Sequence, residues 1–384
     1  MTNRERVKNI LHYEDYDKMP LVHFGFWTET LQLWASQGYI RKEIAENWGD
    51  GNSFDDEISK ILGFDFDWYS VFHPKLGLWP AFENKIIEEL PDGTKKILNG
   101  EGVITIYRPG AGSIPADVDH LLKDRKSWEQ LYLPKLQWSP DRVFKADVRV
   151  NDGMVPFEKG GMEFLKSDKR QFHYGLYCGS LYGWVRNWLT MEGACYLLVD
   201  DEPLLDEIIE TNAEICYRAV KTTLETGAKF DFGHFWEDIC FKNGPLIAPD
   251  VFRKKIGPYY RKICDVLNEY GIDIVSVDCD GCIDTLVPTW IENGVNTMFP
   301  IEVGTWGGSI KKWRQKYGRD IRGVGGVNKV VFSKNKDAVD KEIKRICELV
   351  EMGGYIPCPD HRIPPDAKWE NVVYSCEQMR KYFN

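Results

Sequence analysis

Eight short apolar segments, rich in β-branched and aromatic residues, alternate along this chain with amphipathic stretches of helical periodicity. An apolar segment without a polar face is typical of a strand that is buried on both sides of a parallel sheet. Eight strands that alternate with helices predict an α/β fold, a closed (β/α)8 TIM barrel. An open sheet divided over two domains stays as the alternative. The predicted strands cover residues 19–27, 64–72, 171–178, 229–236, 272–279, 295–301, 320–327 and 354–358.

We expect residues 1–384 to form a single barrel domain with one small insertion after the second strand. Asp92-Gly93 lies between two extended stretches, which is a hairpin signal, so residues 85–108 are predicted to form a small antiparallel β insertion. The stretch that follows, residues 117–132, is predicted to be helical.

Several helix boundaries are marked in the sequence. Thr2 and Glu5 have the spacing of a capping box at the start of a first helix. Gly257-Pro258 predicts a kink in a helix over residues 249–270. Asp284 is expected to cap a helix near residues 284–292.

Composition and charge exclude several classes of function. The net charge is −10 and no long Lys/Arg stripe is present, so binding to nucleic acid is not expected. The sequence has no run of about 18 apolar residues and begins without the apolar core of a signal peptide, which predicts a cytoplasmic protein without a membrane span. The ten cysteines are scattered, as expected for reduced thiols. Cys279 and Cys282 form a C-x-x-C motif without a second pair, so a zinc ribbon or redox motif is not expected.

Chargeable and aromatic residues recur where the predicted strands end. In a (β/α)8 barrel, the active site lies at the carboxyl ends of the strands. The clearest case is the buried strand 272–279, which ends in Asp278-Cys279-Asp280. The full set of strand-end candidates is His23, Phe24, Phe26, Trp68, Tyr69, Tyr177, Cys178, His234, Trp236, Glu237, Asp238, Asp278, Cys279, Asp280, Glu302, Asn328, Lys329, Cys358, Asp360 and His361.

Each candidate also has a purely structural interpretation. Asp278 or Asp280 is equally suited to capping the next helix. The Glu237-Asp238 pair and His361 are compatible with solvated loops, and His23 is compatible with a hydrogen-bonded strand residue. Taken together, acids after three strands and a Cys/His pair after the last strand suit a divalent metal. Zn²⁺ is favoured if Cys or His takes part, and a harder ion if only carboxylates do. The same cluster suits acid/base chemistry by carboxylates with shifted pKa values.

The chain resembles the uroporphyrinogen decarboxylase (URO-D) superfamily over most of its length. The similarity covers residues 2–7 and 18–21 at the start, residues 115–131 in the middle, and Gly193 with residues 200–203 before a long helix. The resemblance implies a single (β/α)8 barrel. True uroporphyrinogen decarboxylases bind tetrapyrrole carboxylates with arginines after the first strand, whereas this chain has no Lys or Arg between Pro20 and Tyr39.

The resemblance is closer to the corrinoid-dependent methyltransferase branch of this superfamily. Thiol-methylating members hold zinc with a His-x-Cys pair after a mid-barrel strand and a Cys after the last strand. Asp278-Cys279-Asp280 stands at the place of that pair, and Cys358 stands near the place of the last Cys. Because aspartates replace the His and Cys, the resemblance implies an oxygen-rich site that favours an ether donor over a thiol.

The preferred hypothesis is therefore a metal-assisted methyltransferase that demethylates a small O-methyl (methoxy) donor and passes the methyl group to a corrinoid on a partner protein. Asp278, Asp280 and His361 would bind the metal, with Glu237 or Cys358 as a further metal ligand or as the acid/base. The resemblance implies zinc as this metal. Glu237, Asp278, Asp280 and His361 are the predicted catalytic residues. The predicted substrate-binding residues are His23, Phe24, Phe26, Trp27, Trp68, Tyr69, Tyr177, His234, Trp236 and Lys329.

Two alternatives remain open. One is a URO-D-like decarboxylase or lyase that acts on a small carboxylated substrate without a metal, with Asp278 and Asp280 as proton shuttles. The other is a non-catalytic barrel whose aromatic mouth holds a ligand.

Overall fold

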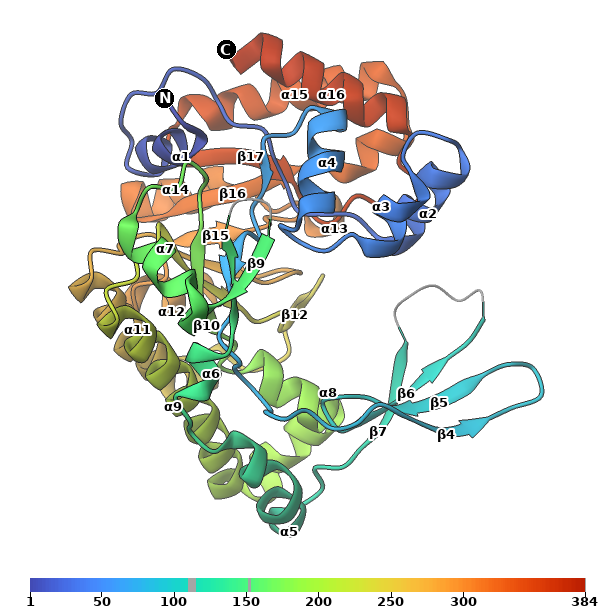
Figure 1. Ribbon diagram of the computed structural model, residues 1–384, viewed down its shortest axis with the longest axis vertical. Helices are drawn as coiled ribbons and strands as arrows, with labels where there is room; N and C mark the ends of the chain where they lie inside the picture. Colours follow the sequence, from blue (N-terminus) through green and yellow to red (C-terminus); the bar gives the residue numbers. More distant parts are fainter. Residues whose placement is uncertain (110–114, 151–152, 384) are drawn as a thin grey trace.

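A parallel sheet of seven strands forms the centre of the fold (Figure 1). The structure is a computed structural model that describes residues 1–109, 115–150 and 153–383. All neighbouring strands of this sheet run parallel, which confirms the predicted α/β class and parallel pairing. In order across the sheet, the strands are β17 (Tyr355–Pro359), β16 (Arg322–Val327), β15 (Thr297–Phe299), β14 (Val275–Asp278), β11 (Phe232–Trp236), β10 (Gly175–Gly179) and β3 (Val71–Phe72).

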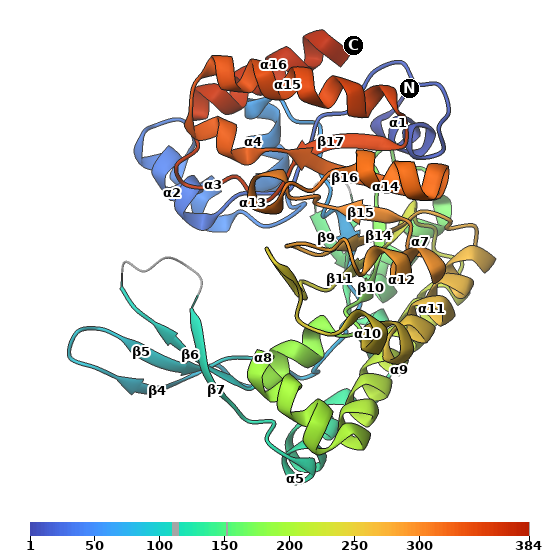
Figure 2. The ribbon, with the colours of Figure 1, turned by 180° about the vertical axis from the view of Figure 1, so that it is seen from behind.

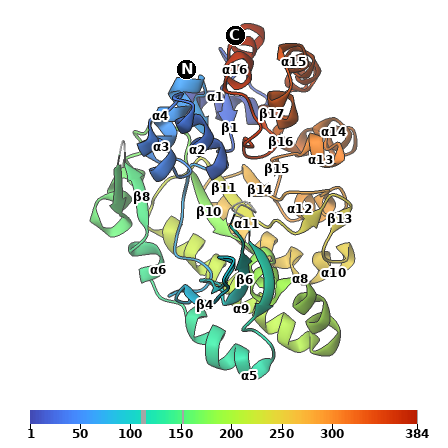
Figure 3. The same ribbon diagram turned by 90° about the vertical axis from the view of Figure 1, so that its right-hand side faces the viewer.

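Two further short strands, β1 (Val22–His23) and β2 (Phe66–Asp67), lie between the two end strands of this sheet, β17 and β3. Strand β1 pairs in parallel with β2, which comes just before β3 in the chain. Strand β1 also lies beside β17 (Figure 3), and an isolated parallel bridge joins Phe26 to Ile363 beyond these two strands. Each predicted strand segment therefore contains a strand. Closure into one barrel, and a single domain, remain predictions.

Apolar side chains pack in two clusters on either side of the strands. The larger cluster fills the space between the strands and the surrounding helices. The smaller one contains inward residues of the strands, among them Phe24, Phe232 and Phe299. Val7 and Leu11 of the first helix join this second cluster, so that helix covers the amino ends of the strands.

The helices lie mainly outside the strands, as Figure 3 shows for α12, α14 and α15. Helices that follow strands have one apolar face, which packs on the outer side of the sheet and excludes water from it. Most of the helices are α1 (Asn3–Leu11), α2 (Thr28–Ser36), α3 (Lys42–Asn47), α4 (Ser53–Leu62), α8 (Gly183–Asp200), α9 (Glu202–Glu225), α10 (Pro249–Lys255), α11 (Gly257–Glu269), α12 (Val287–Glu292), α14 (Ile310–Tyr317), α15 (Lys336–Glu351) and α16 (Trp369–Phe383).

Local sequence signals predicted some helix ends correctly and one incorrectly. The capping box of Thr2 and Glu5 is present at the start of α1. The predicted kink is also confirmed, because α10 ends at Lys255 and α11 begins at Gly257. The predicted cap by Asp284 is wrong. Helix α12 starts at Val287, and the carboxylate of Asp284 instead accepts a hydrogen bond from Nε1 of Trp313 at 2.7 Å.

A four-stranded antiparallel sheet projects from the rest of the chain (Figures 1 and 2). Its first three strands lie within residues 85–108, where an antiparallel insertion was expected. The fourth strand shows that the helix predicted over residues 117–132 is wrong in its first part. Residues 116–120 are extended there, because they pair with the free edge of the third strand of this sheet. The strands are β4 (Lys85–Glu89), β5 (Lys95–Leu98), β6 (Val103–Tyr107) and β7 (Ala116–His120).

Short elements connect these parts. Within the described residues, no helix is long and apolar enough to cross a membrane. The ten cysteines are free of disulfides. The connecting elements are the strands β8 (Asp147–Val150), β9 (Gly153–Pro156), β12 (Cys240–Phe241) and β13 (Gly244–Pro245), the helices α5 (Arg125–Ser127), α6 (Asp141–Phe144), α7 (Gly161–Ser167) and α13 (Val303–Trp306), and the short π and 3-10 turns η1 (Trp128–Tyr132), η2 (Leu133–Leu136), η3 (Phe157–Lys159), η4 (Gly318–Asp320) and η5 (Lys329–Ser333).

Candidate active site

The carboxyl ends of the strands bring together residues that are far apart in the sequence. Asp280 follows β14 and His361 follows β17, and Nε2 of His361 lies 3.1 Å from Oδ2 of Asp280. The ring of Trp27 stacks on His361 with centroids 5.8 Å apart. Phe24 meets the same imidazole edge-on, also at 5.8 Å. We call this end of the sheet the mouth. Residues from three predicted strand ends meet there.

Asp278, the last residue of β14, is a buried acid at the mouth. It is only 3% exposed, and no described residue forms a hydrogen bond with its carboxyl group. Burial raises the pKa of Asp278 well above its ordinary value, and the charges of Asp280 and Asp238 raise it further. The pKa of Asp238 is raised too, first by burial and then by Asp280. These surroundings favour the protonated, neutral form of Asp278.

A ring of four aromatic side chains lies near Asp278, and we call it the aromatic cage. Its members are Tyr69, His73, Tyr177 and His234. Burial raises the pKa of both tyrosines of the cage, and the charge of Asp278 adds to the shift, so the acid lies close to both. Aromatic walls with a few polar groups are typical of small-molecule sites. Around the cage, the ring centroids are separated by 4.9 Å (Tyr69 to His234), 6.4 Å (His234 to Tyr177), 4.5 Å (Tyr177 to His73) and 6.2 Å (His73 to Tyr69).

The cage has polar atoms that no described residue binds. Nδ1 of His234 lies 2.5 Å from Oγ of Ser276, whereas its Nε2 is buried without a hydrogen-bond partner. Burial lowers the pKa of His234 to about 3, so its imidazole is neutral. The hydroxyl groups of Tyr69 and Tyr177 also have no partner among the described residues. These neutral groups are available to bind the polar atoms of a small molecule.

Two pockets border the mouth. One of about 360 Å³ is lined by His361 and Arg362, and one of about 350 Å³ is lined by Tyr69 and His73. Asp50 lines both. Its carboxylate accepts two hydrogen bonds from Arg362, at 2.7 and 2.8 Å. This paired geometry holds the guanidinium at the rim between the two pockets.

Glu237 is enclosed below the mouth and holds the start of α8. Its oxygens accept hydrogen bonds from the backbone N–H groups of Leu181, Tyr182 and Gly183 at 2.7, 2.9 and 2.7 Å. The hydroxyl of Tyr260 donates a further hydrogen bond at 2.5 Å. Because Glu237 is fully buried and its oxygens are occupied, its surroundings suit a positioning role more than the predicted catalytic one.

His23 is enclosed in the packed interior, and Phe26, although almost fully buried, lies at the edge of the pocket that His361 and Arg362 line. Nδ1 of His23 accepts a hydrogen bond from the backbone N–H of Gly25 at 2.9 Å, and its Nε2 lies 2.7 Å from Oγ of Ser59. Burial lowers the pKa of His23 to about 3. The positive φ of Gly25, 76°, turns the chain after Phe24, and Phe26 packs edge-on against aromatic rings of the helical layer.

Trp68 and Cys358 are also fully buried. The indole of Trp68 stacks on His173 at 5.2 Å and on Phe232 at 4.8 Å, which lie toward the amino ends of the strands. Burial raises the pKa of the Cys358 thiol well above its ordinary value, which disfavours the thiolate that a metal requires.

The two remaining predicted residues lie at the edge of the mouth. Trp236 ends β11 and is partly buried against the inner cluster. Nζ of Lys329 lies 3.8 Å from Oε1 of Glu302, whose Oε2 accepts a hydrogen bond from the N–H of Gly281. Lys329 therefore faces the loop that carries Asp280.

Among the described residues, one group of potential metal ligands is already assembled, and it is not the predicted one. Ligand atoms of His23, Asp55 and Asp67 lie within 4.8 Å of one another. The tautomer of His23 disfavours metal binding at this group. Its Nδ1 accepts a hydrogen bond from Gly25, so its Nε2 carries the proton and has no lone pair for an ion.

At the mouth, the available donors are oxygen and nitrogen atoms. Oδ1 of Asp280 and Nδ1 of His361 are buried and have no hydrogen-bond partner in the described part of the chain. The charges of both residues act on Asp238, which therefore lies near them. Carboxylates with one imidazole suit Zn²⁺ or another divalent ion, whereas the protonated thiol of Cys358 does not.

Sequence reasoning missed three residues of the mouth: His73, Arg362 and Asp50. His73 directly follows β3, and Arg362 directly follows His361, so the strand-end rule had the signal to find both. Asp50 lies between α3 and α4, far from any strand end. No pattern in the sequence indicates that it meets Arg362.

Comparisons with known proteins agree with this architecture. Curated protein sequences gave no match. A solved structure of a methyltransferase from Methanosarcina mazei is similar with a TM-score of 0.60 and 16% identity, over 99% of this chain and 98% of that one. A B12-independent methionine synthase from Shewanella sp. W3-18-1 is similar with a TM-score of 0.46 and 11% identity, over 95% of this chain and 98% of that one. At such identity, the likeness to the methyltransferase shows a shared fold.

The match to a family model is more specific. The model of uroporphyrinogen decarboxylase (URO-D) matches residues 188–382, more than half of the chain. The matched region contains β11, β14, β15, β16 and β17, and with them Asp278, Asp280 and His361. This chain therefore belongs to the uroporphyrinogen decarboxylase family.

Proposed function

We propose that this protein is a methyltransferase that takes a methyl group from a small O-methyl donor and delivers it to a corrinoid on a partner protein. The reaction is an O-demethylation at the mouth of a closed (β/α)8 barrel. The methyltransferase from Methanosarcina mazei, which shares the fold, makes methyl transfer a natural choice within the family. The residues at the mouth supply the argument for an oxygen-linked methyl group.

The observation that carries this proposal is the position of Asp278. It is a buried carboxyl group without a hydrogen-bond partner among the described residues, and it lies beside the aromatic cage. When a methyl ether loses its methyl group, the C–O bond breaks and the oxygen keeps the electron pair. A neutral carboxylic acid next to that oxygen can protonate it as it leaves, which lowers the barrier. A neutral Asp278 suits this task.

The other residues of the mouth would position the donor. The rings of Tyr69 and Tyr177 would hold an aryl or apolar group, and their hydroxyls and Nε2 of His234 would bind its polar atoms. Trp27 and Phe24 would close the side next to His361. Excluding water there keeps the leaving oxygen dependent on Asp278 for its proton.

We keep a divalent ion, with Zn²⁺ preferred, as part of the proposal. Asp280 and His361 would hold it, with Asp238 as the third ligand in place of the predicted Asp278 and Cys358. Asp278 then remains the proton donor. The ion would act as a Lewis acid toward the ether oxygen.

A second candidate is the decarboxylase or lyase reaction, because a carbanion formed by loss of carbon dioxide also needs a proton donor such as Asp278. The acidic surroundings argue against a substrate with many carboxylates. Asp50, Asp238 and Asp280 lie at the mouth, where Arg362 is already paired with Asp50.

The test is a methyl-transfer assay with the full chain, added cob(I)alamin and a panel of methoxyarenes. We expect one demethylated phenol for each methylated corrinoid, and metal analysis should find about one divalent ion per chain. Asp117→Asn, at an exposed position on β7, serves as the control for Asp278→Asn. Failure of every donor to methylate the corrinoid would reject the proposal. Release of carbon dioxide that persists in the presence of a chelator would favour the decarboxylase.

A further inference from the structure

A further pocket lies at the opposite end of the strands from the mouth. It has a volume of about 600 Å³, within the range of small-molecule sites. Its walls come from α1 and from the segments that precede β10, β11 and β14. In this fold, the amino ends of the strands usually serve stability, so a cavity of this size there calls for an explanation.

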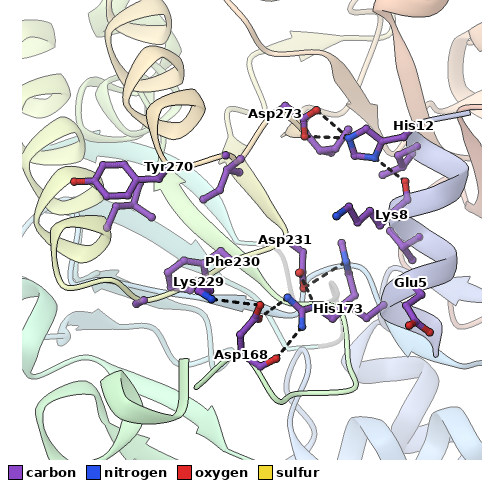
Figure 4. A pocket seen from close by; sticks show the side chains of 18 of the residues that line it. Glu5, Lys8, His12, Asp168, His173, Lys229, Phe230, Asp231, Tyr270 and Asp273 are labelled. Atoms are coloured by element: carbon purple, nitrogen blue, oxygen red, sulfur yellow. Dashed lines mark hydrogen bonds and ion pairs between the residues drawn. The ribbon is translucent and has the colours of Figure 1, made fainter. Parts of the chain in front are cut away.

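The charged groups on the rim of the pocket are mostly neutralised by one another. Arg4 binds Asp231 through Nε at 2.7 Å and Asp168 through Nη2 at 2.6 Å. On the other side, Nε2 of His12 lies 2.9 Å from a carboxylate oxygen of Asp273. Figure 4 shows these two groups of charges on either side of the cavity.

Glu5 also lines the pocket and forms no ion pair with a described residue, but it accepts hydrogen bonds from Thr2. Lys8 is the one cation of the lining without a partner among the described residues. Its side chain extends from α1 into the space between the two groups of ion pairs (Figure 4). Its ammonium group has neither a hydrogen bond nor an ion pair with any described residue. Lys229, the other lysine of the lining, lies 3.9 Å from Asp168.

Part of the pocket lining is an apolar wall. It includes Leu11, Leu224, Ile272 and Ile274, all of which are buried. An apolar wall with one unpaired cation matches a ligand that has an apolar body and a single negative charge. A neutral ligand would leave the ammonium without a partner. A small dianion would be repelled by the three aspartates of the rim.

We propose that this pocket is a second ligand site, which binds a small amphiphilic carboxylate with its anionic group on Lys8 and its apolar body against the apolar wall. The proposal is independent of the reaction at the mouth.

Calorimetry with the full chain tests this site, with octanoate and 3-phenylpropionate as probes and octanamide as the uncharged comparison. We expect one saturable site for each carboxylate and weaker binding of the amide. Lys8→Met keeps the apolar stem and removes the charge, and we expect about tenfold weaker binding, which corresponds to about 1.4 kcal/mol. Lys8→Arg should bind as the wild type does. Lys254→Met, on α10, is the matched control because Lys254 is also exposed and unpaired among the described residues.

Charge reversal makes the outcome decisive. Lys8→Glu should lose the carboxylates and bind octylamine instead. The substituted position is exposed, so the variant should fold, which its circular dichroism spectrum checks. No saturable binding of either carboxylate to the wild type would overturn the proposal, and so would equal affinities of the wild type and Lys8→Met.

Discussion

Asp278→Asn removes the proposed proton donor at almost unchanged size. The wild-type carboxyl group has no hydrogen bond to a described residue, so the change breaks no contact that holds the fold. A positioned general acid typically contributes about 10²–10⁴-fold to a rate, which is about 3–5 kcal/mol of barrier. We therefore expect kcat for methyl transfer to fall by about 10²–10⁴-fold, with KM changed by less than about threefold, because the aromatic cage still binds the donor.

The same variant has a second signature in stability. The folded-state pKa of Asp278 is raised, so the folded protein holds this proton more tightly than the unfolded chain does. Stability from this group is present at low pH and is lost as the pH rises above the unfolded value of about 3.9. Asparagine does not ionise, so Asp278→Asn should be more stable than the wild type at pH 8, and this difference should shrink toward pH 4.

Steady-state kinetics and urea unfolding at the two pH values measure both effects. Asp117→Asn is the control in each. A folded Asp278→Asn protein with kcat within about threefold of the wild type would refute the role of Asp278 as the acid. A stability difference that is the same at pH 4 and pH 8 would refute its raised pKa.

Three further predictions concern neighbouring groups. Glu237→Gln should destabilise the fold by at least about 2 kcal/mol, measured by denaturant unfolding, because an amide cannot accept all the N–H groups at the start of α8; unchanged stability would contradict its positioning role. Burial raises the pKa of Asp55 to about 8, so wild-type stability should fall between about pH 4 and pH 8, and Asp55→Asn should flatten that part of the stability profile; an unaltered slope would show that Asp55 ionises normally. His361→Ala should lower bound metal and methyl transfer together, and full metal content in this variant would exclude His361 as a ligand.

The sequence predicted the parallel strands and their ends because both follow from local rules. A strand buried on both faces is apolar throughout, and the carboxyl ends of parallel strands share one edge of the sheet. These two rules were enough to place Asp280 and His361 together, 3.1 Å apart.

Those rules do not predict which of these side chains are buried in the interior and which line the mouth. Trp68 and Tyr69 are adjacent in the turn that follows β2, yet the indole of Trp68 packs on Phe232 whereas Tyr69 joins the cage. The turn at Gly25 redirects Phe26 in a way that composition does not reveal. The contact of Asp50 with Arg362 joins a loop near the start of the chain to its last strand, and only the three-dimensional structure brings the two together.

The protonation of Asp278 is the measurement that tests the central claim most directly. Infrared difference spectroscopy of the wild type and Asp278→Asn at neutral pH detects the carbonyl stretch of a protonated carboxylic acid. The account predicts a band in the wild type that is missing in Asp278→Asn and that shifts when a methoxyarene binds. A wild type whose spectrum shows Asp278 as an ionised carboxylate, with and without the donor, would contradict it.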